Sequence, residues 1–288
     1  MFSLLRDEST MPPAPQQAPE RHPIPGVKNL VAVASGKGGV GKTTVAVNLA
    51  IALAKFGHKV GLMDADVYGP NVPIMLGTLE QPKATAEHRI FPVDALGVKM
   101  ISMGLLNPGD KPMVWRGPML HSVITQFLRS VEWGELDYLI IDLPPGTGDV
   151  QLTLIQTVAV TGAVVVTTPS TVALADVRKA IEMFRQVNVE VLGVVENMST
   201  FSCPHCAQAI DIFGHGDGAK TALEYGVPVL GEIEIDPRIR VGGDVGKPVA
   251  SLGEAAPGAK SLYALAHAVV KRVDEVRPTS GGPAVQID

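Results

Sequence analysis

The chain has 288 residues, of which 46% are hydrophobic and 18% charged, and its formal net charge is -5. This composition is typical of a globular protein with a sizeable core, and the acidic balance argues against nucleic-acid binding, which favours a basic face. The 2 cysteines are too few for a disulfide framework in a chain of this length.

The two ends of the chain differ from its middle. Residues 1–26 are rich in proline and polar side chains without an apolar period, which predicts a disordered tail, and residues 278–288 look similarly loose. No basic region followed by an apolar run marks a signal peptide. The most apolar helical stretch, Val45–Ala54, is about half of the roughly 20 residues that a membrane span needs. We therefore expect a cytoplasmic protein that binds neither membrane nor nucleic acid.

Residues 27–277 alternate short apolar runs with helical patterns and contain no repeat or composition break, so we expect one domain. Continuous apolar strands separated by helices are typical of an α/β fold, here a doubly wound, mostly parallel sheet with helices on both faces. Strands are predicted at 29–35, 59–66, 98–104, 137–142, 163–169, 189–197 and 227–233, and helices at 42–57, 119–133, 174–187 and 261–276.

A phosphate-binding loop follows the first predicted strand and opens the first helix. The segment GKGGVGKT fits the P-loop pattern G-x-x-x-x-G-K-[ST] in the strand–loop–helix context that confirms it. Its amides and the helix N-terminus would cradle phosphate oxygens, Lys42 would reach the β- and γ-phosphates, and Thr43 would offer a hydroxyl to Mg²⁺. The predicted nucleotide-binding residues are Gly36, Lys37, Gly38, Gly39, Val40, Gly41, Lys42, Thr43 and Thr44.

Acidic residues end two further predicted strands, at the edge where open α/β sheets bind ligands. Asp142 ends LIID and is expected to support Mg²⁺, while Gly146 in the following LPPGTGD could offer its N–H to a γ-phosphate. Asp64 and Asp66 share the end of another strand, and their spacing aims both side chains the same way. We assign Asp66 to orienting the attacking water and Asp64 to supporting the metal. Strand-end carboxylates that only cap the next turn are the alternative.

The P-loop carries a second lysine, Lys37, which an ordinary P-loop does not need. The form KGGVGKTT resembles the deviant Walker A ATPases, a family that includes the Min and Par positioning proteins and the nitrogenase iron protein. In that family the early lysine reaches the nucleotide of the partner chain, so the resemblance implies a catalytic role across a homodimer interface for Lys37. A solvated loop lysine is the alternative.

Several further segments narrow the resemblance. DADVYGPN, WRGP, DLPPGTGD, VVENMS followed by a CxxC, FG and IEIDPRIR occur in the order seen in the Mrp/ApbC group, from about Ile24 to Val273. Proteins of that group are ATP-binding iron–sulfur cluster carriers, so the resemblance implies ATP, a cluster and apoprotein acceptors. By family position Asn197 would hydrogen-bond adenine; a turn asparagine at a strand end is the alternative. For Arg116 in WRGP, a contact with a partner or nucleotide and a purely structural role in a turn remain equal alternatives.

Cys203 and Cys206 lie in the segment FSCPHCAQA. One chain offers two thiolates, whereas zinc and [4Fe–4S] sites usually take four ligands. A two-fold dimer would bring two pairs together, so we predict a cluster, [4Fe–4S] by thiolate count, that bridges the subunits. A shared structural zinc, a redox CxxC and two idle thiols are the alternatives, and the neighbouring His205 and His215 are expected to be bystanders.

Together, the P-loop, the family resemblance and the two cysteines predict a homodimeric P-loop ATPase with slow turnover. It would bind an iron–sulfur cluster and transfer it to apoproteins. A Min- or Par-type positioning switch with zinc at the CxxC is the main alternative. Its membrane form calls for a basic amphipathic terminal helix and its DNA form for a basic face, and the sequence shows neither. A nucleotide-dependent ligase or reductase would need a substrate pocket that no segment indicates.

Overall fold

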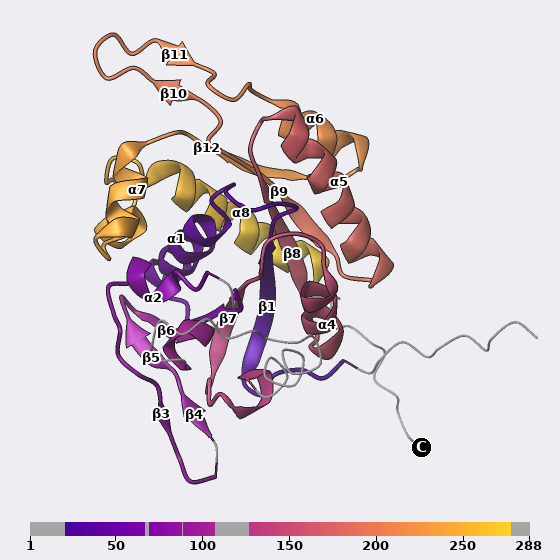
Figure 1. Ribbon diagram of the computed structural model, residues 1–288, viewed down its shortest axis with the longest axis vertical. Coiled ribbons are helices and arrows are strands. Elements are labelled where there is room, and N and C mark those ends of the chain that lie inside the picture. The colour runs from indigo at the N-terminus through magenta and orange to yellow at the C-terminus, as the bar shows by residue number, and fades with distance from the viewer. Residues whose placement is uncertain (1–20, 67–68, 88, 107–126, 278–288) are drawn as a thin grey trace, which may run out of the picture.

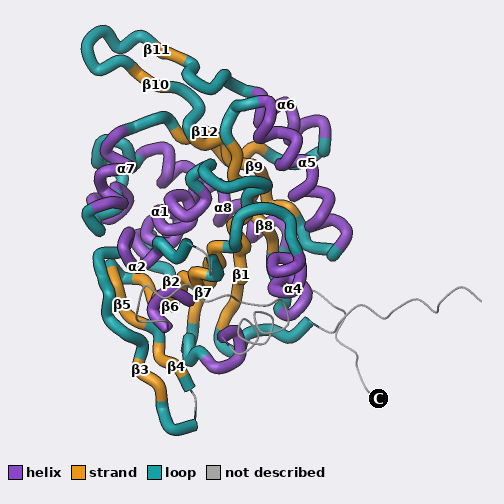
Figure 2. The backbone as a smooth tube through the Cα atoms, viewed as in Figure 1, coloured by secondary structure: helices purple, strands orange, loops and turns teal. Residues whose placement is uncertain are grey.

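The structure is a computed structural model, and it describes residues 21–66, 69–87, 89–106 and 127–277. A single large sheet runs through the molecule with helices packed on both of its faces (Figure 1). Coloured by secondary structure, the strands form one twisted layer between two groups of helices (Figure 2). The predicted doubly wound α/β fold is therefore confirmed.

Within the described residues the sheet has eight strands, and all neighbours pair in parallel except β5 and β6. Strands buried on both faces read as continuous apolar runs, which explains why the sequence revealed most of them. In spatial order they are β12 (Val229–Ile233), β9 (Val191–Asn197), β8 (Gly162–Thr167), β1 (Val27–Ala34), β7 (Leu136–Asp142), β2 (Val60–Asp64), β6 (Val98–Ser102) and β5 (Val93–Ala95).

Each face of the sheet has its own hydrophobic core. On one face pack α1 (Lys42–Lys55), α2 (Val72–Met75), α7 (Pro237–Asp244), η2 (Val249–Leu252) and α8 (Lys260–Val276). On the other face pack α4 (Asp149–Thr157), α5 (Thr171–Gln186) and α6 (Asp217–Glu224). The short η1 (Met103–Leu106) follows β6. Two hydrophobic layers hold the strand ends rigidly, and the loops at those ends carry the chemistry.

Two small hairpins lie outside the main sheet. β3 (Lys83–Ala84) pairs with β4 (Ile90–Phe91), and β10 (Phe201–Ser202) pairs with β11 (Ala209–Ile210). The second hairpin projects away from the body of the molecule, beyond β12 and α6 (Figure 1). It is the hairpin that contains the two cysteines.

The sequence prediction missed the shorter elements. α4, α6 and α7 have nine residues or fewer, and a sequence such as PRIRVGGD shows no apolar period that would reveal a helix. The predicted tail also ends earlier than residue 26, because the carbonyl of His22 accepts the N–H of Ala159 and Ile24 is buried. Residues 1–20 and 278–288, Arg116 and most of the helix predicted at 119–133 lie outside the described residues. Among the helices that the structure describes, none combines the length and apolar character that crossing a bilayer requires.

Candidate functional site

The carboxyl ends of four neighbouring strands align polar residues in one row. Asp64 on β2 is the register partner of Ser102 on β6 and of Asp142 on β7. Asp142 in turn partners Val33 on β1, two residues before Ser35 and the start of the phosphate-binding loop. The parallel register therefore brings together two carboxylates and a P-loop that lie far apart in the sequence.

The loop between β1 and α1 depends on glycines for its shape. Gly39 and Gly41 have φ values of 79° and 81°, in the left-handed region that favours glycine, and Gly41 is the N-cap of α1. A Cβ on Gly41 would come within 2.2 Å of the Asn197 side-chain nitrogen. A Cβ on Gly36 would lie 2.3 Å from the main-chain oxygen of Asp176. The loop is thus packed between β9 and α5 and is not a free turn.

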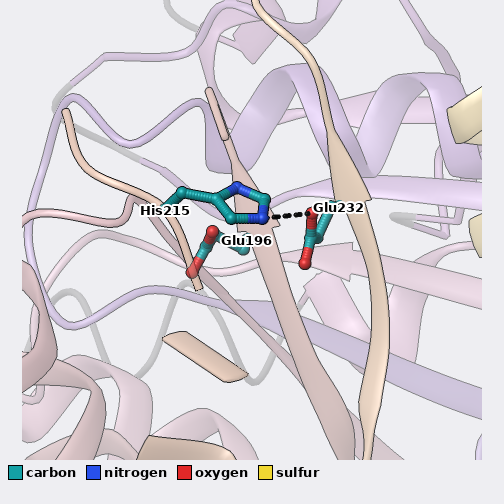
Figure 3. Close-up of side chains that lie close together, drawn as sticks. All are labelled: Glu196, His215 and Glu232. Atoms are coloured by element: carbon teal, nitrogen blue, oxygen red, sulfur yellow. Dashed lines mark ion pairs between the residues drawn. The ribbon is translucent and has the colours of Figure 1, made fainter. Parts of the chain in front are cut away.

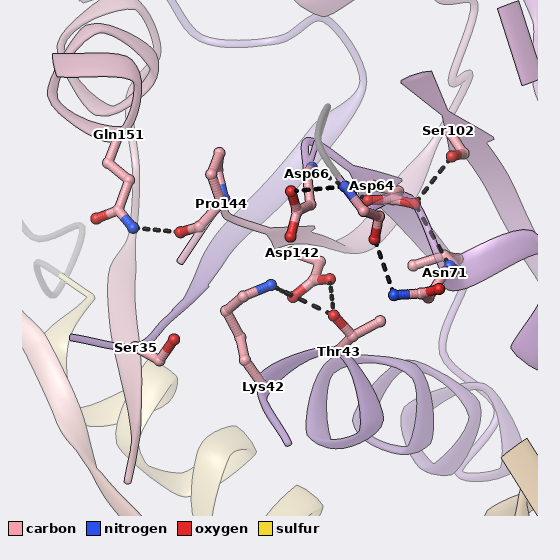
Figure 4. A network of polar contacts seen from close by, with 12 residues as sticks. Ser35, Lys42, Thr43, Asp64, Asp66, Asn71, Ser102, Asp142, Pro144 and Gln151 are labelled. Carbon is pink, nitrogen blue, oxygen red and sulfur yellow. Dashed lines mark hydrogen bonds and ion pairs between the residues drawn. The ribbon is translucent and has the colours of Figure 1, made fainter. Parts of the chain in front are cut away.

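Lys42, Thr43 and Asp142 form the centre of the site (Figure 4). Lys42 Nζ donates to Asp142 Oδ1 at 2.6 Å, and Thr43 Oγ1 donates to Asp142 Oδ2 at 2.7 Å. Lys42 is 6% exposed and Asp142 is fully buried. Burial raises the pKa of Asp142, whereas the charge and hydrogen bond of Lys42 oppose that rise.

Asp64 lies beside this group and is also fully buried. Its Oδ2 accepts the hydroxyl of Ser102 at 2.8 Å, and its Oδ1 accepts the N–H of Asp66 at 3.1 Å. Burial, and then the charge of Asp142, raise the pKa of Asp64 to about 7. In the absence of a metal ion, Asp64 therefore changes its charge near neutral pH.

Asp66 and Gly146 occupy the rim of the phosphate loop. Asp66 lines the same cavity as the loop and accepts the N–H of Gly69 at 3.2 Å. The N–H of Gly146, which the sequence assigned to a γ-phosphate, donates instead to the carbonyl of Ser35 at 2.9 Å. Contact with a phosphate would require this bond to break. The buried Gln151 holds the same turn through a hydrogen bond to the carbonyl of Pro144 (Figure 4).

Two adjoining cavities surround the loop. A cavity of about 230 Å³ is lined by the loop, Asp66 and Lys37, which is half-buried. A second cavity of about 580 Å³ shares Gly41, Thr43, Thr44 and Asn71 with the first and extends between α2 and α7. A polar cavity joined to a larger, mainly apolar one has the shape that a nucleotide needs for its phosphates and base.

Asn197 lies at the end of β9, between the P-loop and the larger cavity. Its Nδ2 donates to the carbonyl of Val40 in the P-loop at 2.8 Å, and the residue lines the larger cavity. Met198, with a φ of 58°, and the segment from Glu234 to Asp244 line the same cavity. The sequence did not assign Met198, Ser102 or this wall to a site. VVENMS and IEIDPRIR, which contain Met198 and much of the wall, carried only the family resemblance, because their residue types have no chemical signature of their own.

The cysteine hairpin lies on the chain segment that follows Asn197. Cys203 N–H donates to the carbonyl of Gln208 at 3.0 Å, and Ala207 N–H donates to the carbonyl of Cys203 at 2.9 Å, which closes a tight turn. Cys203 is half-buried and Cys206 is exposed, and both are free thiols. The backbone N–H groups of His205 and Cys206 lower the pKa of Cys203, so its thiolate is favoured. The hairpin is thus suited to soft-metal binding.

The ParA family model described as NUBPL iron-transfer P-loop NTPase matches residues 26–270. The chain belongs to this family. The resemblance inferred from the sequence motifs is therefore confirmed.

Relatives in the family are similar over most of the chain. An iron–sulfur cluster carrier protein from Aquifex aeolicus is 52% identical over 257 residues, covering 88% of this chain and 70% of its own length. The iron–sulfur cluster transfer protein NUBPL from Mus musculus is 46% identical over 257 residues, covering 88% of this chain and 81% of its own length.

Solved structures agree on the fold. A nucleotide-binding protein from Archaeoglobus fulgidus in complex with ADP has a TM-score of 0.71 and 40% identity, covering 82% of this chain and 91% of that one. The cell-division ATPase MinD from Pyrococcus furiosus has a TM-score of 0.63 at 24% identity, covering 84% and 98%. The second likeness concerns the fold alone.

Proposed function

We propose that this protein is an ATP-hydrolysing carrier that binds an iron–sulfur cluster across a homodimer and transfers it to apoproteins. The observation that carries the proposal is the position of its 2 cysteines, which share an exposed hairpin rooted in the wall of the nucleotide cavity. The names of its relatives, iron–sulfur cluster carrier and transfer proteins, support the same function.

The phosphates of ATP would occupy the smaller cavity and the adenine the larger one. Lys42 leaves its ion pair with Asp142 and binds the β- and γ-phosphates, since phosphate oxygens present more negative charge than one carboxylate. The amides of the loop and of the α1 N-terminus donate to the remaining oxygens. With its Nδ2 bound to Val40, Asn197 keeps its Oδ1 as an acceptor for the adenine amino group.

The oxygen atoms around Thr43 fit a magnesium ion. Thr43 Oγ1 and Asp142 Oδ2 lie 2.7 Å apart, and Asp64 adds a second carboxylate on the neighbouring strand. Hard oxygen donors of this kind suit Mg²⁺, which would supply charge neutralisation for the transferring phosphoryl group. Thr43, Asp142 and Asp64 are therefore the residues proposed to hold it.

Hydrolysis transfers the γ-phosphoryl group to water, so that the bond to the β-phosphate oxygen breaks and ADP, phosphate and a proton leave. Asp66, at the rim of the phosphate cavity, orients the attacking water. Lys37 of the partner subunit approaches the γ-phosphate and stabilises the charge that develops there, as an arginine finger does. The N–H of Gly146 exchanges its bond to Ser35 for one to the γ-phosphate.

The cluster would lie on the two-fold axis between two cysteine hairpins. Each chain contributes Cys203 and Cys206, and two chains supply the four thiolates of a [4Fe–4S] cluster. An exposed hairpin leaves the cluster accessible to an acceptor protein. A zinc ion could use the same four sulfurs, in which case the protein would be a positioning switch with a structural clasp.

Anaerobic reconstitution with iron and sulfide tests the proposal. Wild-type protein is expected to hold about four irons per dimer, with visible absorption, and to pass the cluster to an apoferredoxin. The Cys203→Ala/Cys206→Ala variant should lose both, while His205→Ala, in the same turn, should keep them. Colourless wild-type protein with one zinc per dimer would overturn the carrier function in favour of the positioning switch.

ATP hydrolysis needs a separate assay. Wild-type protein should release phosphate slowly, and Lys42→Ala and Lys37→Ala should both abolish release. Lys42→Ala should weaken ATP binding to an isolated chain far more than Lys37→Ala, because Lys37, although it borders its own cavity, acts on the γ-phosphate of the other subunit. Phosphate release that survives in Lys37→Ala would remove the trans-acting lysine from the mechanism.

A further inference from the structure

The segment from Glu196 to Thr200 joins the nucleotide cavity to the cysteine hairpin in five residues. Successive side chains at a strand end point to opposite faces of the sheet. Asn197 faces the P-loop, where it donates to the carbonyl of Val40. Glu196 faces the opposite layer and contacts the chain that returns from the hairpin.

Glu196 is a buried carboxylate, 1% exposed, with an unusual pair of partners. Its Oε1 accepts the N–H of Gly216 at 3.0 Å and its Oε2 accepts the N–H of Gly218 at 2.7 Å. A Cβ on Gly218 would approach the second oxygen to 2.6 Å, so the fit leaves no room for another side chain. The carboxylate thereby fixes the start of α6, where the hairpin segment re-enters the fold.

Thr200 connects the two limbs of the hairpin segment. Its hydroxyl lies 3.0 Å from Asp211 Oδ1 and 3.2 Å from His215 Nδ1. His215 Nε2 in turn lies 3.8 Å from Glu232 Oε2 on β12 (Figure 3). Both limbs are therefore held to β9 and β12, next to Asn197 and Glu234, which line the larger cavity.

The main chain adds a second connection. The N–H of Ser199 donates to the carbonyl of Ile233 at 3.0 Å, and the N–H of Ile235 donates to the carbonyl of Thr200 at 2.9 Å. Ile235 itself lines the larger cavity. An adenine base in this cavity would therefore contact Ile235. Ile235 is hydrogen-bonded to Thr200, which lies at the base of the cysteine hairpin.

The cluster of Glu196, His215 and Glu232 has the composition of a metal site, but its bonds indicate a structural role. Both oxygens of Glu196 already accept main-chain N–H groups, and the imidazole is bound to Thr200. The three groups hold the hairpin segment and require no ion to do so.

We propose that Glu196 and Thr200 are positioning residues that couple nucleotide binding to the geometry of Cys203 and Cys206. The coupling rests on the proposed function, because it assigns to the nucleotide a control over the thiolates that would hold the cluster. When ADP or ATP displaces the end of β9 through Asn197, the buried Glu196 carboxylate and the Thr200 hydroxyl move the hairpin limbs with it. By linkage, a metal held by the thiolates changes nucleotide affinity by the same factor.

The thiols themselves report on this coupling, because the chain's 2 cysteines are both in the hairpin. The experiment measures the rate of thiol reaction with a disulfide reagent in metal-free protein, with and without Mg-ADP. In wild-type protein ADP should change the rate by about fivefold or more, the lower end of typical coupling. Thr200→Val and Glu196→Gln should reduce that change to less than twofold while ADP still binds.

A matched control variant removes a hydroxyl from the β3–β4 hairpin, which carries no cysteine. Thr85 Oγ1 accepts the N–H of Arg89 at 3.3 Å, far along the chain from the cysteines, so Thr85→Val should keep the full response to ADP. Thr200→Val retains the shape of the side chain, which keeps the test valid should Glu196→Gln fail to fold. Sedimentation of the same samples excludes a change in dimer content as the cause of altered reactivity.

The reciprocal measurement is the affinity for Mg-ADP with and without Zn²⁺ bound to the thiols. In wild-type protein Zn²⁺ should change the Mg-ADP affinity by the same factor by which Mg-ADP changes the Zn²⁺ affinity, and Thr200→Val should lose both effects. An unchanged thiol rate in wild type, or an equal response in Thr200→Val, overturns the coupling even where iron and sulfide still load. A nucleotide response in protein that cannot hold a cluster would sustain the coupling and reject the carrier function.

Discussion

Asp64 and Asp142 stand opposite each other as register partners on the parallel neighbours β2 and β7, and both are fully buried. One buried ammonium group, that of Lys42, pairs with Asp142 at 2.6 Å. Two carboxylates at the ends of neighbouring strands are suited to a doubly charged cation. In the metal-free protein their proximity raises the pKa of Asp64, after the larger effect of burial.

The first prediction concerns the pH dependence of stability without metal or nucleotide. The pKa of Asp64 rises from 3.8 to about 7, so the folded protein holds a proton that the unfolded chain has lost. The stabilisation is complete below pH 3.8 and is lost as the pH rises towards about 7. Urea unfolding in a chelator should therefore show lower stability at about pH 8 than at about pH 5, and Asp64→Asn should flatten this difference.

Asp137 provides the control for that experiment. A hydrogen bond from Lys28 lowers the pKa of this half-buried carboxylate, so its contribution is present above pH 3.8 and is lost only below it. Asp137→Asn should leave the difference between about pH 5 and about pH 8 intact. If Asp64→Asn retained the wild-type slope, the protonation of Asp64 would not be its source.

The second prediction concerns Asn197. Asn197→Ala removes the donor to the Val40 carbonyl and leaves a main-chain acceptor of the P-loop without its partner. We expect a loss of about 1–3 kcal/mol in stability and a loss of ADP affinity of about tenfold or more. Calorimetric titration with Mg-ADP and urea unfolding measure the two effects.

Asn48 is the matched residue for this test. It is also buried, donates to the carbonyl of Thr44 at 2.8 Å and accepts the N–H of Ala250 at 3.1 Å, but it does not line the cavity. Asn48→Ala should lower stability to a similar extent with a smaller effect on ADP. Equal losses of affinity in both variants would mean that Asn197 acts only through the stability of the fold.

The third prediction separates backbone strain from packing in the P-loop. Gly39 and Gly41 both have positive φ, but only Gly41 has an atom in the path of a Cβ. Gly39→Ala should cost about 1 kcal/mol from strain alone, whereas Gly41→Ala should cost about 2 kcal/mol more because the methyl group meets Asn197. Denaturant unfolding without nucleotide compares them, and equal costs would contradict the contact.

The fourth prediction concerns the reactivity of the hairpin thiols. Backbone N–H groups lower the pKa of Cys203, so its thiolate forms at lower pH than in an unfolded chain. In the Cys206→Ala variant, alkylation of Cys203 should show a midpoint below that of the same protein in denaturant. The comparison is made without metal. A midpoint at or above the denatured value would show that the turn does not stabilise the thiolate.

Much of this protein could be read from the order of its residues. The P-loop was recognisable because phosphate binding needs glycine and lysine at fixed spacing within one short segment. The central strands were recognisable because burial on both faces requires unbroken apolar runs. Cys203 and Cys206 stood out because they are the chain's only 2 cysteines and are separated by just two residues.

The tertiary structure decided which of these residues meet. Ser102 at Asp64, the Asn197 amide at Val40 and the clasp of Glu196 on Gly216 are contacts between distant segments, and their residue types occur at many strand ends without a site. Strand order and register place them, and these depend on how two hydrophobic layers pack rather than on any local spacing. The sequence by itself determined the chemistry of the protein's parts; packing decided that the cavity beside the P-loop and the cysteine hairpin share one strand end.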